Sequence, residues 1–345
     1  MKILVYGQVY PDSFARNIIV TLEDMGHTVF RSRAGDMDVG TRRFWLLKYW
    51  LYNYAGKLMP SLERKAEDTL IQEVADLQPE LVIIPGEQPH PAIIRAIKRA
   101  AKCKVVQWMS DQLTSFGRQY ILAADYDALF FKDEYVVQFA REKLEKPAYF
   151  LPQACNPKWH HRPAALSEAD RKKYGCDLTV AGNLYWYRAL MLEPFVGYNM
   201  KVWGANAPRW LESPVTRFYQ HHYVAEEEKA KAMTAAKIVM NTMHYAEILG
   251  CNLRLFETAG CGAFQIVDWR PNLYKFLEPE REVVTFHSRR ELKEKVDYYL
   301  AHDEERQAIA DRAYARAHAE HTYRHRLTQL LEWTFNDSPI ISTTR

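Results

Sequence analysis

The sequence predicts an α/β protein built of two doubly wound domains, each a parallel sheet with helices on both faces. Its 345 residues are too many for one ordinary domain, and 48% hydrophobic with 26% charged residues is typical of a well-packed globular protein. Short apolar runs alternate with amphipathic segments from the first residue onward, as a layered α/β protein requires. This alternation stops in the stretch 153–175 and then starts again, which predicts a second domain of the same kind.

The first domain is expected to cover residues 1–155. The run KILVY at 2–6 predicts a buried parallel strand, after which Gly7 turns the chain into a helix with one apolar face. That face carries Phe14, Ile18, Leu22 and Met25. Further strands are expected in HTVFRS (27–32), LVIIPG (81–86), KVVQWMSD (104–111), ALFF (128–131) and AYFLP (148–152), with a helix around AIIRAIKRAAK (92–102).

Residues 156–175 are expected to link the domains, because they are rich in Pro, His and charge and lack a sustained period. The second domain is expected at 176–318, and residues 319–345 are expected to form a C-terminal helix that returns to the first domain, followed by a tail. The strands of the second domain are expected in CDLTVAGN (176–183), MKVWGAN (200–206), KIVMNTM (237–243), AFQIVD (263–268) and EVVTF (282–286). Two such domains in tandem form a cleft between the carboxyl ends of two sheets, where doubly wound folds bind ligands.

Composition favours a cytoplasmic protein without a nucleic-acid partner. The net charge is +3, and Lys and Arg are spread along the chain, so no polyelectrolyte is needed to balance them. The five cysteines include no C-x-x-C pair, which argues against a disulfide framework and a zinc knuckle, and no metal site is expected. The first residues are not expected to act as a secretory signal, and no run reaches the roughly 18 apolar residues of a spanning helix.

Several common enzyme motifs are missing from the sequence. We find no G-x-x-x-x-G-K-[ST], no G-x-S-x-G, no H-E-x-x-H and no clear G-x-G-x-x-G after the first strand, whose loop is GQVYPDSF (7–14). Simple nucleotide hydrolases, serine hydrolases and ordinary nicotinamide enzymes are therefore disfavoured.

The stretch GCNLRLFETAGCGAFQIVDW (250–269) predicts a short helix that binds a nucleotide. Asn252 is the expected N-cap and residues 260–262 end the helix, so the backbone N–H groups at its start form an anion site. Arg254 and Glu257 lie one turn apart and face the same way. A carboxylate there would repel a phosphate unless it binds a neutral group, and a ribose diol meets that condition. The alternative is an exposed Arg/Glu pair worth a few tenths of a kcal/mol.

Three segments resemble the C-terminal region of CgeB-type spore-maturation proteins and related glycosyltransferases of the GT-B fold: NLRLFETAGCGAF (252–264), DWRPNLYKFLEPEREVVTFHSRRELKEKVDYYL (268–300) and HTYRHR (321–326). The resemblance covers roughly 150–330. It implies two Rossmann-like domains that face a central cleft, with the C-terminal helix crossing back to the first. It also implies transfer from a UDP-, GDP- or dTDP-sugar without an obligatory cofactor or metal, with retention of configuration. Glu257 matches the glutamate that holds the ribose in this superfamily.

The resemblance assigns further positions to the nucleotide. In VAGNLYWYR, Gly182 and Asn183 would let backbone approach the diphosphate and Arg188 would supply a cation, although Arg188 could equally be a surface residue at a helix start. In YQHHYV, the base would lie against the backbone of His222, Tyr223 and Val224; a plain strand-to-helix turn is at least as well supported.

The transferred sugar is expected to meet His244 and Glu247 in NTMHYAEILG. In many retaining relatives a second glutamate stands eight residues before the ribose glutamate, and here that position is Leu249. Glu247 would replace it through a differently shaped loop, and this departure leaves the identity of the sugar open.

Asp111 follows a strand of the first domain and could orient or deprotonate an acceptor hydroxyl, with a helix cap as the favoured alternative. Gly7, Gly86 and Glu87 are expected at the same edge. The aromatic segment RRFWLLKYWLYNYAGKLMP (42–60) favours a helix buried in the domain or against a second subunit. The alternative is an interfacial helix that reaches a lipid-linked acceptor or the inner membrane face.

The leading hypothesis is thus a glycosyltransferase with a glycan, protein or lipid-linked acceptor. A nucleotide-sugar epimerase or phosphorylase on the same frame is the second hypothesis, since fold alone does not separate these activities. The third is a sugar-nucleotide-binding protein that has lost transfer activity.

Overall fold

The chain folds into two compact units in the computed structural model, which describes residues 1–35, 60–113, 119–204 and 210–336. The first unit comprises Met1–Leu151 and Arg326–Arg345, and the second comprises Pro152–His325. Residues 42–59 of the aromatic segment lie outside the described residues, so its two interpretations stay predictions. Among the helices that are described, none combines the length and apolar character needed to span a membrane.

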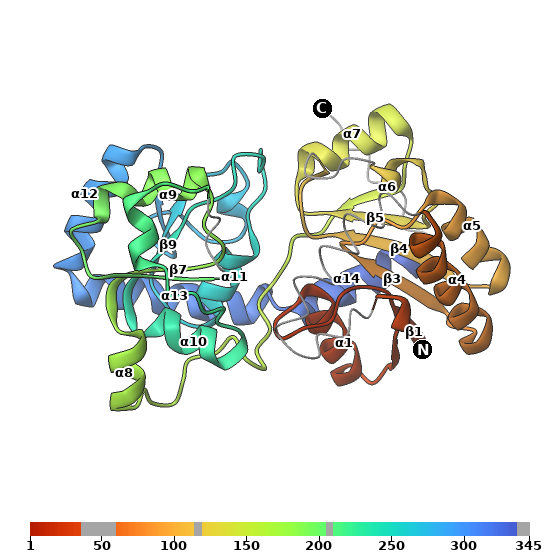
Figure 1. Ribbon diagram of the computed structural model, residues 1–345, viewed down its shortest axis with the longest axis horizontal. Coiled ribbons are helices and arrows are strands. Elements are labelled where there is room, and N and C mark those ends of the chain that lie inside the picture. The colour runs from red at the N-terminus through yellow and green to blue at the C-terminus, as the bar shows by residue number, and fades with distance from the viewer. Residues whose placement is uncertain (36–59, 114–118, 205–209, 337–345) are drawn as a thin grey trace. The chain divides into compact units, whose positions relative to one another are not determined.

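The first unit is built on a six-stranded parallel sheet of order β2-β1-β3-β4-β5-β6 (Figure 1). Its strands are β1 (Lys2–Val5), β2 (Thr28–Arg31), β3 (Leu81–Pro85), β4 (Lys104–Met109), β5 (Ala128–Phe131) and β6 (Ala148–Phe150). Its helices are α1 (Phe14–Asp24), α4 (Pro60–Leu77), α5 (Pro91–Ala100), α6 (Tyr120–Ala123) and α7 (Glu134–Leu144), with a 3-10 turn at Arg33–Gly35. The strands are apolar runs because helices cover both faces of the sheet.

Alternating residues of these strands pack against different helices. One set, which includes Leu4 and Val82, joins residues of α4, α5, α6 and α7 in a single buried cluster. On the other face Phe14 of α1 packs edge-to-face on Trp108, and Trp333 of α14 (Tyr323–Phe335) stacks on Phe130. The C-terminal helix therefore ends on the first unit, as expected.

The second unit contains a five-stranded parallel sheet of order β11-β10-β9-β7-β8. Its strands are β7 (Cys176–Ala181), β8 (Met200–Trp203), β9 (Ala236–Asn241), β10 (Gln265–Asp268) and β11 (Val284–Phe286). Its helices are α8 (Glu168–Tyr174), α9 (Trp186–Leu192), α10 (Glu226–Thr234), α11 (Leu253–Gly260), α12 (Arg289–Leu300) and α13 (Asp303–Glu320). Short 3-10 turns lie at Glu193–Phe195, Pro214–Phe218 and Leu273–Lys275. All the strands expected from the sequence are present in the two sheets.

The strand order of the second sheet determines where a ligand fits. The chain leaves β7 toward β8 on one side and then crosses back to β9 on the other side of β7. In open α/β sheets, ligands bind outside the carboxyl ends of the strands at such a switch point. The loops after β7 and β9 therefore flank the expected site.

Residues 156–175, expected to be a linker, belong to the second unit and include α8. Ser167 and Asp170 form a capping box at the start of this helix, and Lys231 of α10 pairs with Asp170. The segment shows no sustained apolar period because α8 has only seven residues and is attached largely by polar contacts.

Candidate functional site

A chain of buried amides fixes the start of α11 beside the switch point. Asn252 is the N-cap, as expected, and its Oδ1 accepts a hydrogen bond from Leu255 N at 3.2 Å. Its Nδ2 donates to Oδ1 of Asn241, at the end of β9, at 2.8 Å. Asn241 in turn donates to Gln265 of β10, at 3.3 Å, and Gln265 donates to Leu255 O at 2.9 Å. The helix start is thus held rigidly, with its N–H groups at the carboxyl edge of the sheet.

Arg254 packs directly on the loop after β7. Its Nε donates to the carbonyl oxygen of Ala181, and its guanidinium covers Gly182. Gly182 has φ +147°, and a Cβ there would lie 2.7 Å from Arg254 Cζ. The positive φ favours glycine at this position, and a larger residue would also require the Arg254 guanidinium to shift. The exposed Asn183 follows it in the loop.

Arg188 is buried, so the interpretation as a surface residue at a helix start is wrong. Its Nε donates to Thr242 Oγ1 at 3.0 Å, a further nitrogen donates to the Asn183 carbonyl oxygen, and its Cζ lies 4.7 Å from the Tyr185 ring centroid. Burial, followed by the nearby positive charge of Arg254, lowers the pKa of Arg188 to about 10. The side chain remains protonated at neutral pH. Two close guanidinium groups at the switch point make this edge attractive to a multiply charged anion.

Glu257 is also buried, with 2% of its surface exposed, so the alternative of an exposed Arg/Glu pair is wrong. Its Oε1 accepts a hydrogen bond from Nζ of the buried Lys229 on α10 at 2.8 Å. His160 Nε2 lies 3.6 Å from the same oxygen. Asn156 N donates to His160 Nδ1, so a neutral His160 carries its proton on Nε2, which faces Glu257.

The loop expected to hold a base is tied to α10. His222 Nε2 lies 3.0 and 2.9 Å from the two carboxylate oxygens of Glu228, and the His222 carbonyl oxygen accepts from Gly204 N at 2.9 Å. The Val224 side chain is buried, whereas Tyr223 is 43% exposed. The backbone of this loop is therefore fixed from two sides.

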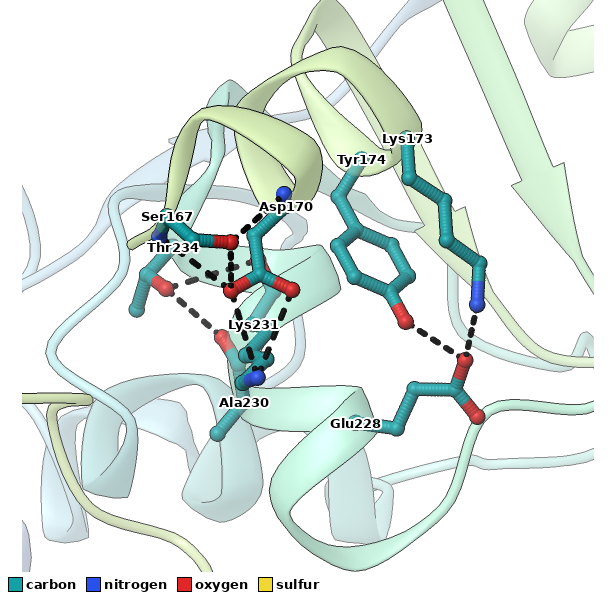
Figure 2. A network of polar contacts seen from close by, with 8 residues as sticks. All are labelled: Ser167, Asp170, Lys173, Tyr174, Glu228, Ala230, Lys231 and Thr234. Carbon is teal, nitrogen blue, oxygen red and sulfur yellow. Dashed lines mark hydrogen bonds and ion pairs between the residues drawn. The ribbon is translucent and has the colours of Figure 1, made fainter. Parts of the chain in front are cut away.

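Glu228 also receives hydrogen bonds from α8, from Tyr174 Oη at 2.6 Å and Lys173 Nζ at 2.7 Å (Figure 2). Burial alone would raise the pKa of its carboxyl group, but the hydrogen bonds from Lys173, Tyr174 and His222 outweigh burial and lower the pKa to about 2.

This low pKa predicts a pH-dependent stability. The folded-state pKa of Glu228 lies below the ordinary value of 4.5, so its stabilisation is complete above about pH 4.5 and is lost as the pH falls toward 2. We expect Glu228→Gln to lower the free energy of unfolding at neutral pH and to leave it nearly unchanged near pH 2. Urea titrations of both proteins across this range measure the difference, and a difference that is constant with pH would contradict the assignment.

The loop after β9 places Glu247 near Arg188, and its His244 ring packs against Tyr185. The loop is closed by Glu247 N, which donates to His244 O at 3.0 Å, and Arg270 Nε donates to Glu247 O at 2.8 Å. The Glu247 side chain is buried, and its negative charge acts on Arg188. Leu249, at the position of the family's second glutamate, is half-buried.

Asp111 belongs to the first unit, where it is exposed two residues beyond the end of β4. Gly7, Gly86 and Glu87 also belong to the first unit, whereas the residues expected to bind the nucleotide and the transferred sugar all belong to the second unit. The structure brings Gly182, Asn183, Arg188, Asn252 and Arg254 together around the switch point, and it connects Glu257 and the 222–224 loop through neighbouring residues of α10.

Sequence reasoning missed the residues that hold the expected ones in place: Asn241, Thr242, Lys229, His160 and Arg270. The first two end or follow the strand β9, a position that marks candidate site residues in parallel sheets. No sequence signal connects Lys229 or His160 with Glu257, because these contacts arise only from tertiary packing.

Known proteins support a glycosyltransferase-type architecture. The family described as glycosyl transferase-like matches residues 162–332. No curated protein matches the sequence. Among solved structures, trehalose-6-phosphate synthase OtsA is similar with a TM-score of 0.70 at 12% identity, covering 98% of this chain and 99% of that chain.

Two further structures have the same architecture. A glycosyltransferase from Rickettsia africae has a TM-score of 0.66 at 10% identity, with 98% of this chain and 99% of that chain covered. HepE from Anabaena, in complex with UDP-glucose, has a TM-score of 0.62 at 13% identity, with coverage of 96% and 98%. The chain therefore has the GT-B fold, and its residues 162–332 match the family described as glycosyl transferase-like.

Proposed function

We propose that the protein is a glycosyltransferase of the CgeB type, which moves a hexosyl or related group from a nucleotide-diphosphate sugar to a glycan, protein or lipid-linked acceptor. The observation that carries this proposal is the pair of arginines at the switch point, Arg188 and Arg254, beside the capped start of α11. This arrangement suits a diphosphate, and the UDP-glucose bound by the similar HepE supports a nucleotide-sugar donor.

In this proposal the two arginines stabilise the negative charge that develops on the leaving diphosphate. They take the place of a metal ion, so transfer proceeds without one. Glu257 accepts the ribose hydroxyl groups and the 222–224 backbone holds the base. A carboxylate that accepts from both hydroxyls of a diol favours UDP- and GDP-sugars over the 2′-deoxy dTDP-sugars.

His244 and Glu247 are proposed to contact the transferred sugar from the loop after β9. Retention of configuration is expected from the superfamily, with a leaving phosphate oxygen taking the acceptor proton. If the product is inverted, Asp111 is the first candidate for the base. We place the reaction in the cytoplasm, and segment 42–60 is the candidate contact with the inner membrane face or a second subunit.

The test combines binding with product analysis. Thermal unfolding is measured with UDP-, GDP- and dTDP-glucose, and the donor present at 100 times its Kd should add about 2.7 kcal/mol to the free energy of unfolding. NMR of the products, with EDTA present, then distinguishes transfer or slow hydrolysis from epimerisation and phosphorolysis. Binding without any turnover would favour a non-catalytic sugar-nucleotide-binding protein, and an absence of binding to every donor would contradict the proposal.

A further inference from the structure

Two adjacent residues of α10 contact two different parts of the nucleotide site. Glu228 bonds to His222 in the loop proposed to hold the base. Lys229 bonds to Glu257, the carboxylate proposed to hold the ribose. The side chains of successive helical residues point about 100° apart. Glu228 and Lys229 can therefore reach two different elements, the 222–224 loop and the helix α11.

The contact from Lys229 orients the carboxylate group of Glu257. The two side chains are 8% and 3% exposed, and their atoms are 2.8 Å apart. Buried charged groups in proteins are usually paired with an opposite charge, and Lys229 provides that partner for Glu257. Lys229 bonds to Oε1 of Glu257, and in this proposal the other carboxylate oxygen accepts from a ligand hydroxyl.

The helix α10 is itself held by α8 at two points (Figure 2). Lys173 and Tyr174 donate to Glu228, and Lys231 of α10 pairs with Asp170 of α8 at 3.2 Å. Asp170 is in turn fixed by Ser167, whose hydroxyl donates to it at 2.8 Å. The first turns of α10 therefore have a defined position, which a positioning role requires.

We propose that Glu228 and Lys229 are positioning residues for the nucleoside end of the donor: Glu228 sets the base loop through His222, and Lys229 sets the ribose carboxylate Glu257. This inference rests on the proposed function and assigns the selectivity for base and ribose to one helix. Neither residue needs to touch the nucleotide or the reacting atoms.

The experiment measures dissociation constants of wild type, Glu228→Gln and Lys229→Gln by calorimetry. The probes are UDP, GDP, their 2′-deoxy counterparts and inorganic pyrophosphate. We expect Lys229→Gln to weaken the better ribonucleotide about tenfold and to reduce the preference for ribose over deoxyribose. Glu228→Gln should reduce the preference between UDP and GDP. Pyrophosphate affinity should stay within about twofold in both variants, because Arg188 and Arg254 are unchanged.

Lys231→Gln is the matched control. It removes a cation from the same helix and breaks the ion pair with Asp170, but its side chain contacts neither His222 nor Glu257 among the described contacts. It should keep both preferences. Lys229→Arg retains the charge and should restore part of the preference for ribose.

The outcomes separate the two proposals. Unchanged preferences in Glu228→Gln and Lys229→Gln, with nucleotide binding intact, would overturn the positioning role alone. If Lys229→Gln and Lys229→Arg both lose affinity for pyrophosphate, Lys229 has a purely structural role. This result would also overturn the positioning role. A wild-type protein that binds pyrophosphate but none of the nucleotides would overturn the proposed function and, with it, this inference.

Discussion

Replacing Arg188 and Arg254 together by methionine is expected to reduce the affinity for a nucleoside diphosphate by about two to four orders of magnitude. Hydrogen bonds that involve a charged group contribute about 1.5–3 kcal/mol each, so two arginines supply about 3–6 kcal/mol. Arg188 is buried and held by Thr242, and Arg254 is held by Ala181, so both are already placed before a ligand arrives. Little ordering entropy is lost on binding, which preserves their contribution.

Calorimetry with UDP and GDP measures this loss, and the matched control is Arg290→Met. Arg290 lies on α12 and its side chain is 90% exposed, so its removal subtracts the same single charge as Arg254→Met without changing the site. An equal loss of affinity in the control and in the single Arg254→Met variant would mean that net charge, and not the switch-point geometry, attracts the ligand.

Glu257→Ala is expected to destabilise the second unit by about 3–5 kcal/mol, because it leaves Lys229 buried without its carboxylate. The double variant Glu257→Leu with Lys229→Met removes both charges and should recover most of this free energy, since apolar side chains often replace a buried ion pair at no cost. Urea unfolding measures both effects.

Glu257→Ala and the double variant Glu257→Leu with Lys229→Met should each bind ribonucleotides and 2′-deoxyribonucleotides with equal affinity. The double variant therefore separates the stability of the ion pair from the function of the carboxylate. A Glu257→Ala protein that unfolds at the same urea concentration as wild type, or a double variant that still prefers the ribonucleotide, would contradict the roles assigned to Glu257.

The fold was predictable because its strands are buried on both faces. Runs such as LVIIP and ALFF are apolar without alternation, which is typical of parallel strands covered by helices on both sides. Local chemistry also predicted the N-cap Asn252 and the end of α11 near Gly262, which has φ +68°. These features depend on neighbouring residues in the sequence and hence leave a local signal.

The partners of the site residues were not predictable in the same way. Lys229 stands in AEEEKAKAMTAA, a segment so rich in charge that an exposed position is the natural expectation, yet it is buried against Glu257. The sequence around Arg188 supported a surface position and a site position equally. The burial of Arg188 depends on Thr242 and Asn183, which come from two different loops, so the local sequence does not reveal it. A helical period identifies a buried face but not the residue that packs on it.

The boundary between the two units was also not predictable from local sequence. Residues 156–175 have the composition of a linker, but α8 is attached to α10 by ion pairs and hydrogen bonds that no apolar period reveals.

A crystal structure of the protein with bound UDP or GDP, whichever binds more tightly, tests the central claim most directly. We expect the diphosphate at Arg188 and Arg254 and a ribose hydroxyl oxygen within about 2.6–3.2 Å of a carboxylate oxygen of Glu257. A nucleotide whose ribose lies away from Glu257, or whose diphosphate contacts neither arginine, would contradict the account.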